Sequence, residues 1–293
     1  MRVDSLALAF EQRRTRLRGI AYRMLGSAAE ADDAVQETWL RLDRVAAAEI
    51  ANLDGWLTTV VTRICLDALR VRAQRAETSD VVAVDARATG PGADPEDEAL
   101  LADSVGRALL VVLDVLGPEE RVAFVLHDLF AVPFADIAPM LGRTPATTKK
   151  LASRARLRVH APARVEQAEL AEQRVAVAAF LKAAREGDLG ELLAVLAPDV
   201  VRTADPAALP PGMAALVRGA AAVADGALAL RQRSRDAVLL LVDGRPGLVV
   251  AQAGKPQFAV TFTVHAGRIA AYDVVAAPDR LAELTLALLP DQS

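Results

Sequence analysis

Apolar side chains recur at helical spacing along the first quarter of the chain. Between residues 6 and 77 they are separated by three or four positions, proline is absent, and glycine occurs only at positions 19, 26 and 55. Such spacing gathers apolar side chains on one face of a helix. We therefore predict an all-helical bundle over residues 6–77.

The helical pattern stops and then returns. Over residues 78–98 glycine, proline and acidic residues replace the apolar periodicity, which predicts a linker. The periodicity resumes at about residue 97, and Gly117-Pro118 is followed by two glutamates where a new helix would begin. We predict a second all-helical domain over residues 99–160.

The pattern changes again after about residue 165. Two helices are predicted over residues 166–186 and 188–197, and the apolar runs that follow predict short strands. Gly244, Gly254 and Gly267 separate the later runs at intervals typical of hairpins. The predicted strands cover residues 200–203, 238–242, 247–253, 258–265 and 268–275.

These patterns together predict a multidomain chain, with two all-α domains followed by an α+β domain over residues 166–293. The length of 293 residues agrees with this division, because a single hydrophobic core rarely grows so large. Hydrophobic residues make up 53% of the chain and charged residues 25%. This composition excludes a wholly disordered protein.

The composition also limits the chemistry that the chain could perform. Cys65 is the single cysteine and cannot form an internal disulfide, and the three histidines are not spaced as a metal site. No apolar run approaches the roughly 20 residues that span a bilayer. We expect a cytoplasmic protein without secretion signal or membrane anchor, and without metal or cofactor.

Charge is segregated along the chain, although the net charge is only −4. Residues 81–115 contain seven acidic residues and two arginines, whereas residues 116–160 contain seven basic and four acidic residues. The overall charge argues against a simple histone-like DNA binder. The local charge instead indicates a basic module that follows an acidic linker.

A polar patch is predicted on one side of the helix over residues 30–42. The apolar positions of this helix, from Ala31 to Leu42, fall on the opposite side. Such a patch can be a solvated helix face or a docking surface for another protein. Its members are Asp32, Asp33, Gln36 and Glu37.

The next helix, over residues 54–72, is predicted to carry a mixed polar and basic face. Its inward positions would be Trp56, Leu57, Val60, Val61, Ile64 and Ala68, leaving Thr59, Thr62, Arg63, Asp67 and Arg70 more exposed. Arg63 and Asp67 could form an ion pair one turn apart. Opening DNA requires cations for phosphates and a pocket for an unstacked base. Candidates of suitable type are Asn52, Trp56, Thr59, Arg63 and Arg70, although Trp56 could equally be a core residue.

Residues 134–159 have the pattern of a helix-turn-helix. Ala138 is small where two helices would cross, Gly142 permits a left-handed turn, and Thr144 with Pro145 would begin the second helix. Leu151, Ala155 and Val159 are predicted to point inward. The exposed remainder indicates a DNA-binding helix, or a basic helix that pairs with an acidic partner. It carries Thr147, Lys149, Lys150, Ser153, Arg154, Arg156 and Arg158.

These segments resemble, in order and spacing, RNA polymerase sigma factors of the extracytoplasmic-function type within the sigma-70 family. Residues 21–42 resemble regions 2.1 to 2.2, residues 55–70 regions 2.3 to 2.4, and residues 134–159 region 4.2. The resemblance covers about residues 6–160. Arg63 departs from the asparagine that many relatives carry, and Thr148 from the usual branched apolar residue.

The resemblance implies partners and roles for the candidate residues. The patch Asp32, Asp33, Gln36 and Glu37 would dock on the clamp helices of the β′ subunit of core RNA polymerase, whose β subunit is a further expected partner. The candidates on residues 52–70 would capture the melted −10 element of promoter DNA, and the helix-turn-helix would read the −35 element. The acidic linker would thread through the RNA path of the polymerase, or serve as a flexible solubilising segment.

The C-terminal domain resembles the SnoaL-like fold of the nuclear transport factor 2-like group, which is fused to some sigma factors of this type. The similarity rests on residues 180–181, 187–200, the late strands and residues 278–281. It implies a regulatory motif formed by Pro278, Asp279, Arg280 and Leu281. Residues 204–208 replace a glycine-rich stretch that is often found after the first strand.

The resulting hypothesis is a sigma factor, not an enzyme and with no catalytic residue, that directs RNA polymerase to promoters. Its C-terminal domain would modulate that activity and could bind a small-molecule ligand. One alternative is an enzyme in this domain that uses His265 and Asp273 as acid and base. Another is a helix-turn-helix repressor with a ligand-sensing domain, which leaves the patch at residues 32–37 unexplained.

Overall fold

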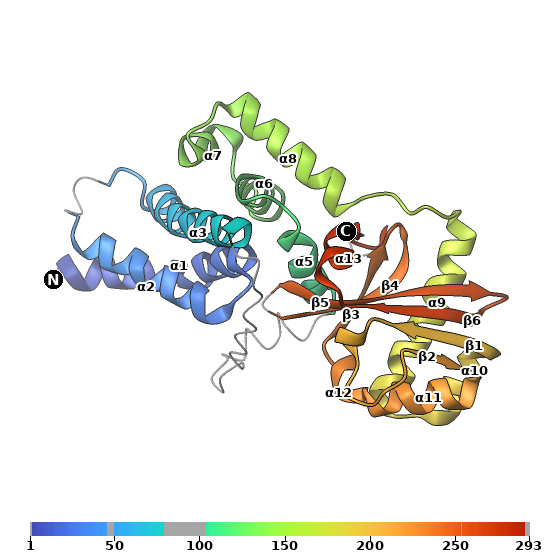
Figure 1. Cartoon of the computed structure of the whole chain (residues 1–293). Coiled ribbons are helices and arrows are strands. Elements are labelled where there is room, and N and C mark those ends of the chain that lie inside the picture. The colour runs from blue at the N-terminus through green and yellow to red at the C-terminus, as the bar shows by residue number, and fades with distance from the viewer. Residues whose placement is uncertain (1, 46–49, 79–103, 253, 291–293) are drawn as a thin grey trace. The chain divides into compact units, whose positions relative to one another are not determined.

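The computed structural model describes residues 2–45, 50–78, 104–252 and 254–290. The chain forms two compact units (Figure 1), one from residues 1–102 with 113–157 and the other from residues 103–112 with 158–293. The first unit is helical where it is described, and the second combines helices with a sheet. Most of helix α5 (Ser104–Asp114) therefore packs within the second unit. The linker predicted over residues 78–98 lies, apart from residue 78, outside the described residues.

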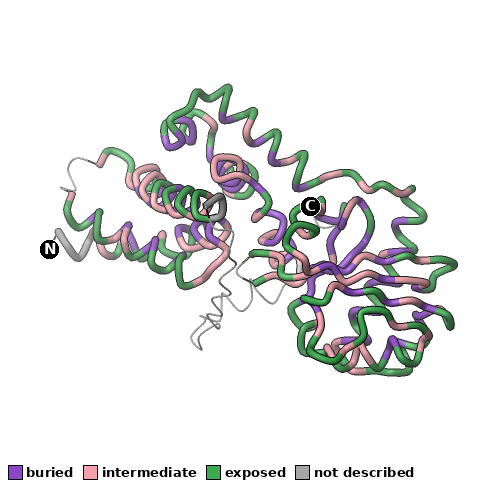
Figure 2. The backbone as a smooth tube through the Cα atoms, viewed as in Figure 1, coloured by how far each residue is buried: buried purple, intermediate pink, exposed green. Residues whose placement is uncertain are grey.

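The first unit begins with three helices, as the sequence predicts: α1 (Arg2–Leu25), α2 (Ala28–Asp43) and α3 (Leu53–Thr78). Their apolar faces meet in a core that includes Ile20, Met24 and Leu42, each fully buried. Burial alternates along these helices (Figure 2), as expected where one face meets a core and the other meets solvent. The Phe10 and Trp39 rings join α1 to α2 with their centroids 5.1 Å apart.

The buried face of α3 differs from the predicted one. Thr62, expected to be exposed, is fully buried, whereas Val60, Ile64 and Ala68 are only half-buried. The prediction was wrong here because α3 packs against four helices, α1, α2, α6 and α7, rather than one. Cys65 is buried, as expected, and burial raises the pKa of its thiol to about 12.

The helix-turn-helix is formed as the sequence predicts. It comprises α6 (Pro118–Phe124), the π-helical turn η2 (Val125–Leu129), α7 (Phe134–Leu141) and α8 (Pro145–Val159). Gly142 adopts a left-handed conformation with φ of 65°, and the Arg143 amide donates to the Ala138 carbonyl at 3.0 Å. Thr144 caps α8, because its hydroxyl oxygen accepts the Thr147 amide at 3.2 Å.

The inward face of α8 is broader than predicted. Ala155 and Val159 are buried, as expected, but Leu151 is half-buried and Thr148 is fully buried. The Thr148 hydroxyl donates to the Thr144 carbonyl at 3.0 Å, so a buried polar group is satisfied within the helix. This bond lets threonine occupy a position where the resembling family has an apolar residue.

The second unit contains a seven-stranded sheet in the order β2-β1-β6-β5-β4-β3-β7. The β1–β6 pair is parallel and the other pairs are antiparallel. The five predicted strands are present, whereas β2 and β7 were missed because they are too short for a periodic signal. The strands are β1 (Leu196–Ala204), β2 (Leu216–Arg218), β3 (Ala237–Val242), β4 (Arg245–Gln252), β5 (Lys255–His265), β6 (Arg268–Val275) and β7 (Leu286–Ala287).

Two hairpins connect the antiparallel strands through tight turns. Asp243 and Gly244 between β3 and β4 both have positive φ, and so do Ala266 and Gly267 between β5 and β6. This is the backbone of a type I′ turn, whose twist matches that of the flanking strands. Strands β3 and β4 are buried along most of their length (Figure 2), since neighbouring elements cover both faces.

Helices pack against the sheet and close the core of the second unit. The predicted helices are present as α9 (Gln167–Glu186) and α10 (Leu189–Val195), and α9 packs across β3 to β6. Three further helices were missed by the sequence prediction. They are α11 (Ala220–Ala229), which packs on β1 and β2, α12 (Arg231–Ser234) and α13 (Pro278–Glu283). The expected class, two helical domains and a C-terminal α+β domain, is confirmed. No helix among the described residues is both long and apolar enough to cross a membrane.

A buried guanidinium ties together distant parts of the helical unit. Arg121 on α6 is 4% exposed, and it donates to the Met24 carbonyl at the end of α1 and to the Asp114 carboxylate, each at 2.9 Å. Burial lowers the pKa of Arg121, and the attraction of Asp114 partly offsets this effect. The charge is tolerated inside because a carboxylate and a carbonyl replace water.

We expect the substitution Arg121→Met to lower the free energy of unfolding of the helical unit by about 2–3 kcal/mol, because it leaves Asp114 and the Met24 carbonyl unpaired. Urea denaturation followed by tryptophan fluorescence measures this unit, since both tryptophans, Trp39 and Trp56, lie in it. Arg41→Met breaks an exposed pair with Glu37 and should cost less than about 0.5 kcal/mol. Equal costs for the two variants would contradict the stabilising role of the buried pair.

Candidate functional site

Helix α2 presents the polar patch that the sequence places at residues 32–37. Ser27 caps the helix by accepting the Glu30 amide, and the apolar residues from Ala31 to Leu42 face the core. This burial fixes the rotation of the helix, so that Asp32, Asp33 and Gln36 are exposed and Glu37 is half-exposed. The structure therefore brings the four residues together on one outer face.

The members of this patch differ in their contacts. Asp32 accepts from Arg18 of α1 with Nε–Oδ1 at 2.6 Å, and Glu37 from Arg41 with Nε–Oε1 at 2.9 Å. Within the described residues, Asp33 and Gln36 have no side-chain hydrogen bond or ion pair. The patch thus combines two carboxylates held in place with two side chains available for a partner.

The candidate residues at the start of α3 have structural contacts that the sequence did not reveal. The Asn52 side-chain carbonyl accepts the Gly55 amide at 3.1 Å and so caps α3, and the Thr59 hydroxyl donates to the Gly55 carbonyl at 2.8 Å. Trp56 is half-buried. Arg63 is exposed and does not form the possible ion pair with Asp67 in the described structure.

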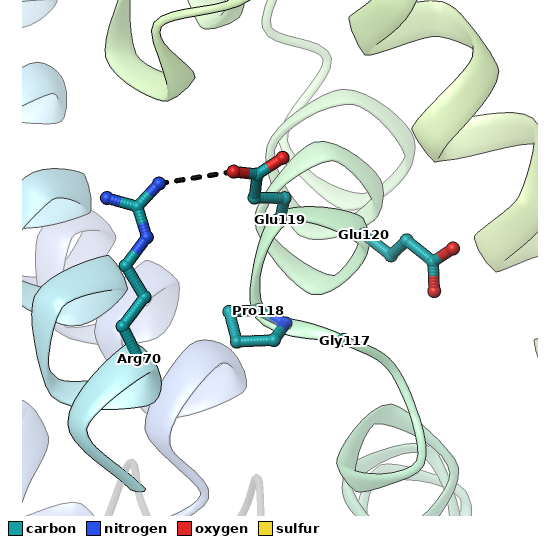
Figure 3. A pocket seen from close by; sticks show the side chains of 5 residues that line it. All are labelled: Arg70, Gly117, Pro118, Glu119 and Glu120. Carbon is teal, nitrogen blue, oxygen red and sulfur yellow. Dashed lines mark hydrogen bonds and ion pairs between the residues drawn. The ribbon is translucent and has the colours of Figure 1, made fainter. Parts of the chain in front are cut away.

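Arg70, also a candidate for DNA binding, instead contacts an acid of the helical unit. Its guanidinium donates to Glu119 Oε1 at 3.2 Å, and the two side chains line an open pocket of about 280 Å³ (Figure 3). Arg143, in the turn before α8, donates to the same carboxylate through Nε at 3.1 Å and Nη2 at 3.2 Å. Burial raises the pKa of Glu119, but the two arginines outweigh this effect and hold the net pKa below its ordinary value. Sequence reasoning missed this role of Glu119 and saw it as a helix-start residue.

Helix α8 presents most of the predicted −35 residues on its solvent side. Thr147, Lys149, Lys150, Ser153 and Arg154 are exposed, whereas Arg156 is half-buried and paired with Asp128. Within the described residues, neither lysine forms an ion pair. Lys149 and Lys150 are therefore cations that an incoming phosphate could reach without displacing an internal carboxylate.

The motif Pro278 to Leu281 forms helix α13, and Asp205 holds its start. The Asp205 Oδ2 atom accepts the amides of Ala276 and Ala277, each at 2.9 Å. Arg280 of the motif pairs with both Asp205 and Asp273, while Asp279 is exposed and Leu281 half-buried. Burial raises the pKa of Asp205, but the amides and Arg280 outweigh this effect and the net pKa is lowered. Sequence reasoning saw residues 204–208 only as a departure from a glycine-rich pattern.

The sheet domain also contains a cavity of about 90 Å³, whose walls are mainly apolar. Two residues considered as an acid–base pair, His265 and Asp273, do not line it. His265 is exposed at the end of β5, and Asp273 bonds Thr203 and Arg280. Among the described residues no cluster of histidine, cysteine, aspartate or glutamate could hold a metal ion.

Comparison with known proteins places these features in a family. The model of Sigma-70 region 2 matches residues 9–75, and that of Sigma-70 region 4 matches residues 106–159. The matched segments contain the polar patch of α2, the candidate residues of α3 and the helix-turn-helix.

Two curated relatives from Mycobacterium tuberculosis extend the similarity over nearly the whole chain. The extracytoplasmic-function (ECF) RNA polymerase sigma factor SigJ is 38% identical, with 92% of this chain and 91% of that protein covered. The probable ECF RNA polymerase sigma factor SigI is 34% identical, with 95% of each covered. The crystal structure of SigJ matches with 35% identity, a TM-score of 0.47, and 94% and 97% coverage. At this identity and coverage, the protein belongs to the ECF RNA polymerase sigma factors, the family that directs RNA polymerase to promoters.

Proposed function

We propose that the chain acts as a promoter-specificity subunit, with four segments in separate roles. Residues 6–77 bind core polymerase and the −10 element, residues 78–98 form the connecting linker, residues 99–160 read the −35 element, and residues 166–293 regulate the others. The observation that carries this proposal is the pair of exposed faces in the helical unit, one acidic on α2 and one cationic on α8, each with side chains available for a partner. These roles place the protein in the cytoplasm with the polymerase.

The acidic face of α2 is suited to a basic surface of the polymerase. Asp33 and Gln36 have no competing contact in the described chain, and Arg18 and Arg41 orient Asp32 and Glu37 toward solvent. We propose that this face docks on the β′ subunit, while other parts of the chain contact the β subunit. Exposed charges of this kind steer association and select the partner.

Charge reversal by Asp33→Lys with Glu37→Lys should weaken binding to cognate core RNA polymerase by about a hundredfold or more, because like charges would then face each other. Biolayer interferometry with immobilised polymerase measures the affinity, and circular dichroism checks the fold. The control Glu186→Lys with Asp225→Lys makes the same change in net charge at exposed positions of the second unit. Equal affinities of the two variants would show that α2 is not the docking surface.

The cationic side chains of the helical unit fall into two groups. Arg70, Arg143 and Arg156 are paired with internal carboxylates, whereas Lys149 and Lys150 have no ion pair within the described residues. A phosphate must compete with Glu119 or Asp128 for the arginines, but meets no such competitor at the lysines. We propose that the lysines make the first phosphate contacts, with Thr147, Ser153 and Arg154 beside them at the base edges.

Lys149→Ala with Lys150→Ala should reduce the slope of log affinity against log salt by about two units for a promoter fragment, because two phosphate contacts are lost. Fluorescence anisotropy over a salt series measures this slope. The chain has four lysines, so the exposed Lys182 and Lys255 of the second unit supply a matched control pair. An unchanged slope in the α8 variant would remove these lysines from the interface.

At the −10 element, we propose that Arg63 and Arg70 contact phosphates and that the half-buried Trp56 offers its exposed edge to an unstacked base. Asn52 immediately precedes α3 and Thr59 lies in its second turn, and the bonds of both to Gly55 fix the start of the helix. Arg70 must leave Glu119 to reach DNA. Release from this acid therefore accompanies promoter binding.

The C-terminal domain is proposed to be regulatory rather than catalytic. Neither His265 nor Asp273 lines the apolar cavity, which argues against an acid–base site there. The repressor alternative does not account for the α2 face. Regulation is proposed to act through the motif at residues 278–281, which Asp205 holds in a defined position.

The substitution Asp205→Ala tests this role in the full chain. It removes two amide contacts and the Arg280 pair, so amide hydrogen exchange at residues 276–283 should accelerate at least about tenfold. Run-off transcription with core polymerase should then change by about fivefold or more, upward if the held motif restrains the sigma segments and downward if it assists them.

The full chain is preferable to a truncated one, because removal of the sheet domain would strip α5 of its packing. Asp225→Ala, which removes an exposed acid of α11 in the same unit, serves as the control. Faster amide exchange without any change in transcription would show that the motif at residues 278–281 does not regulate the sigma segments.

A further inference from the structure

The cavity of the second unit has an unusual polar composition. Its lining residues come from the sheet and from helices α9, α11 and α12, which are labelled in Figure 1, and most of them are apolar or aromatic, including Phe180, Leu248 and Phe258. Two guanidinium groups, Arg202 and Arg233, also line it, and no acidic residue belongs to its described walls. The charged side chains among its described walls are therefore all cationic.

Arg202 is the decisive residue. It lies on β1, its side chain lines the cavity, and the residue is only 5% exposed. One of its donors, Nη2, bonds the Ala214 carbonyl at 2.6 Å, but within the described residues no carboxylate pairs with it. An arginine remains charged at any physiological pH. Burying a guanidinium without a carboxylate partner costs folding free energy, because the charge loses its hydration. The buried Arg121 of the helical unit has such a partner in Asp114.

A second donor lies beside Arg202. Tyr272 on β6 is the direct partner of Arg202 in the parallel β1–β6 pair, so both side chains lie on the same face of adjacent strands. Tyr272 is 7% exposed and its ring packs against Phe180 and Phe262, with centroids 5.4 and 5.6 Å away. Among the described residues its hydroxyl forms no hydrogen bond. A guanidinium and a phenolic hydroxyl on adjacent strands therefore both line the same mainly apolar cavity.

The rest of the site favours an apolar tail on the anion. Arg233 lies at the exposed side of the cavity, with its guanidinium 5.9 Å from the centroid of the Phe258 ring. A volume of about 90 Å³ is smaller than the roughly 150 Å³ cavity that holds benzene in an engineered protein. It is also well below the roughly 300–1,000 Å³ of drug-sized pockets. The enclosed space therefore suits a carboxylate and the first carbons of a single chain rather than a polycyclic ligand, and a longer tail would extend toward the exposed side beside Arg233.

We propose that this cavity binds a short apolar carboxylic acid, with the carboxylate held by Arg202 and Tyr272 and the alkyl tail against the aromatic and aliphatic walls. The proposal gives a chemical class to the small-molecule ligand that the sequence analysis considered for the C-terminal domain. Carboxylate pairs with guanidinium through parallel, charge-assisted hydrogen bonds, and the apolar walls exclude the water that would weaken them.

Saturation-transfer difference NMR on the full chain tests the proposal with three probes: hexanoate, its uncharged analogue hexanamide, and acetate. Hexanoate should bind saturably with a Kd of about 1 mM or tighter, and hexanamide should bind about tenfold to hundredfold more weakly, because it lacks the charge. Acetate should also bind more weakly, because it lacks the tail. Absence of saturable hexanoate binding up to about 10 mM, or equal affinities for the acid and the amide, would overturn the proposal.

Substitutions assign the binding to the cavity. Arg202→Gln should weaken hexanoate binding about tenfold or more and leave hexanamide binding unchanged. Arg218→Gln on the neighbouring strand β2 is the matched control, since Arg218 is exposed and does not line the cavity. Tyr272→Phe preserves the packing and should weaken hexanoate binding about threefold to tenfold. If Arg202→Gln does not fold, the affinity of Tyr272→Phe for hexanoate tests the site instead.

Hexanoate binding that is unchanged in both folded variants would place the ligand elsewhere and reject the site. Because these measurements need neither polymerase nor DNA, their failure would leave the proposed promoter-recognition role intact. Conversely, loss of polymerase binding in α2 variants would say nothing against the cavity.

Discussion

The burial of α3 among four other helices is the constraint on which the helical unit depends. Leu57, Val61, Cys65, Leu66 and Leu69 form its buried stripe, while Thr58 and Thr62 extend that stripe to the side. Helix α3 contacts α1, α2, α6 and α7, and its exposed residues, among them Arg63, Asp67 and Arg70, lie on the remaining side. Its rotation is therefore fixed, and with it the direction of Arg63 and Arg70. The packing of α2 against the same core turns the polar patch of α2 outward.

Internal carboxylates pair with some of the cations of the helical unit and not with others. Glu119 holds Arg70 and Arg143, Asp128 holds Arg156, and Asp114 holds the buried Arg121. These contacts use the planar guanidinium, which can donate to two acceptors at once. The lysines of α8 remain outside this arrangement. The helical unit thus carries both cations committed to its own structure and cations available to DNA, which the proposed order of phosphate contacts requires.

Each of the two units contains a buried arginine, and the two arginines differ in their partners. Arg121 is matched by Asp114 and by a backbone carbonyl, so its charge contributes to the packing of the helices around it. Arg202 has a carbonyl partner but, within the described residues, no carboxylate, and it opens onto a cavity. The cost of that charge is the physical basis for assigning an anionic ligand to the sheet domain. At the far end of β1, Asp205 shows a third arrangement, in which a carboxylate is satisfied by amides and one arginine.

The sequence by itself determined the class of each domain, the three N-terminal helices, the helix-turn-helix with its cap at Thr144, and five of the seven strands. These features depend on local periodicity and turn chemistry, which neighbouring residues specify. It also grouped the α2 patch and the exposed face of α8, since residues three or four apart share a helix face.

Only the tertiary structure decided the burial of Thr62, the pairing of Arg70 with Glu119, the hold of Asp205 on the C-terminal motif, and the apposition of Arg202 and Tyr272. The physical reason is separation along the chain: these contacts join residues tens of positions apart, and no local pattern encodes which carboxylate or cavity a side chain will meet. Short elements such as β2 and α12 were undetermined for a related reason. Their few residues carry too little periodicity, and packing against the rest of the domain sets their conformation.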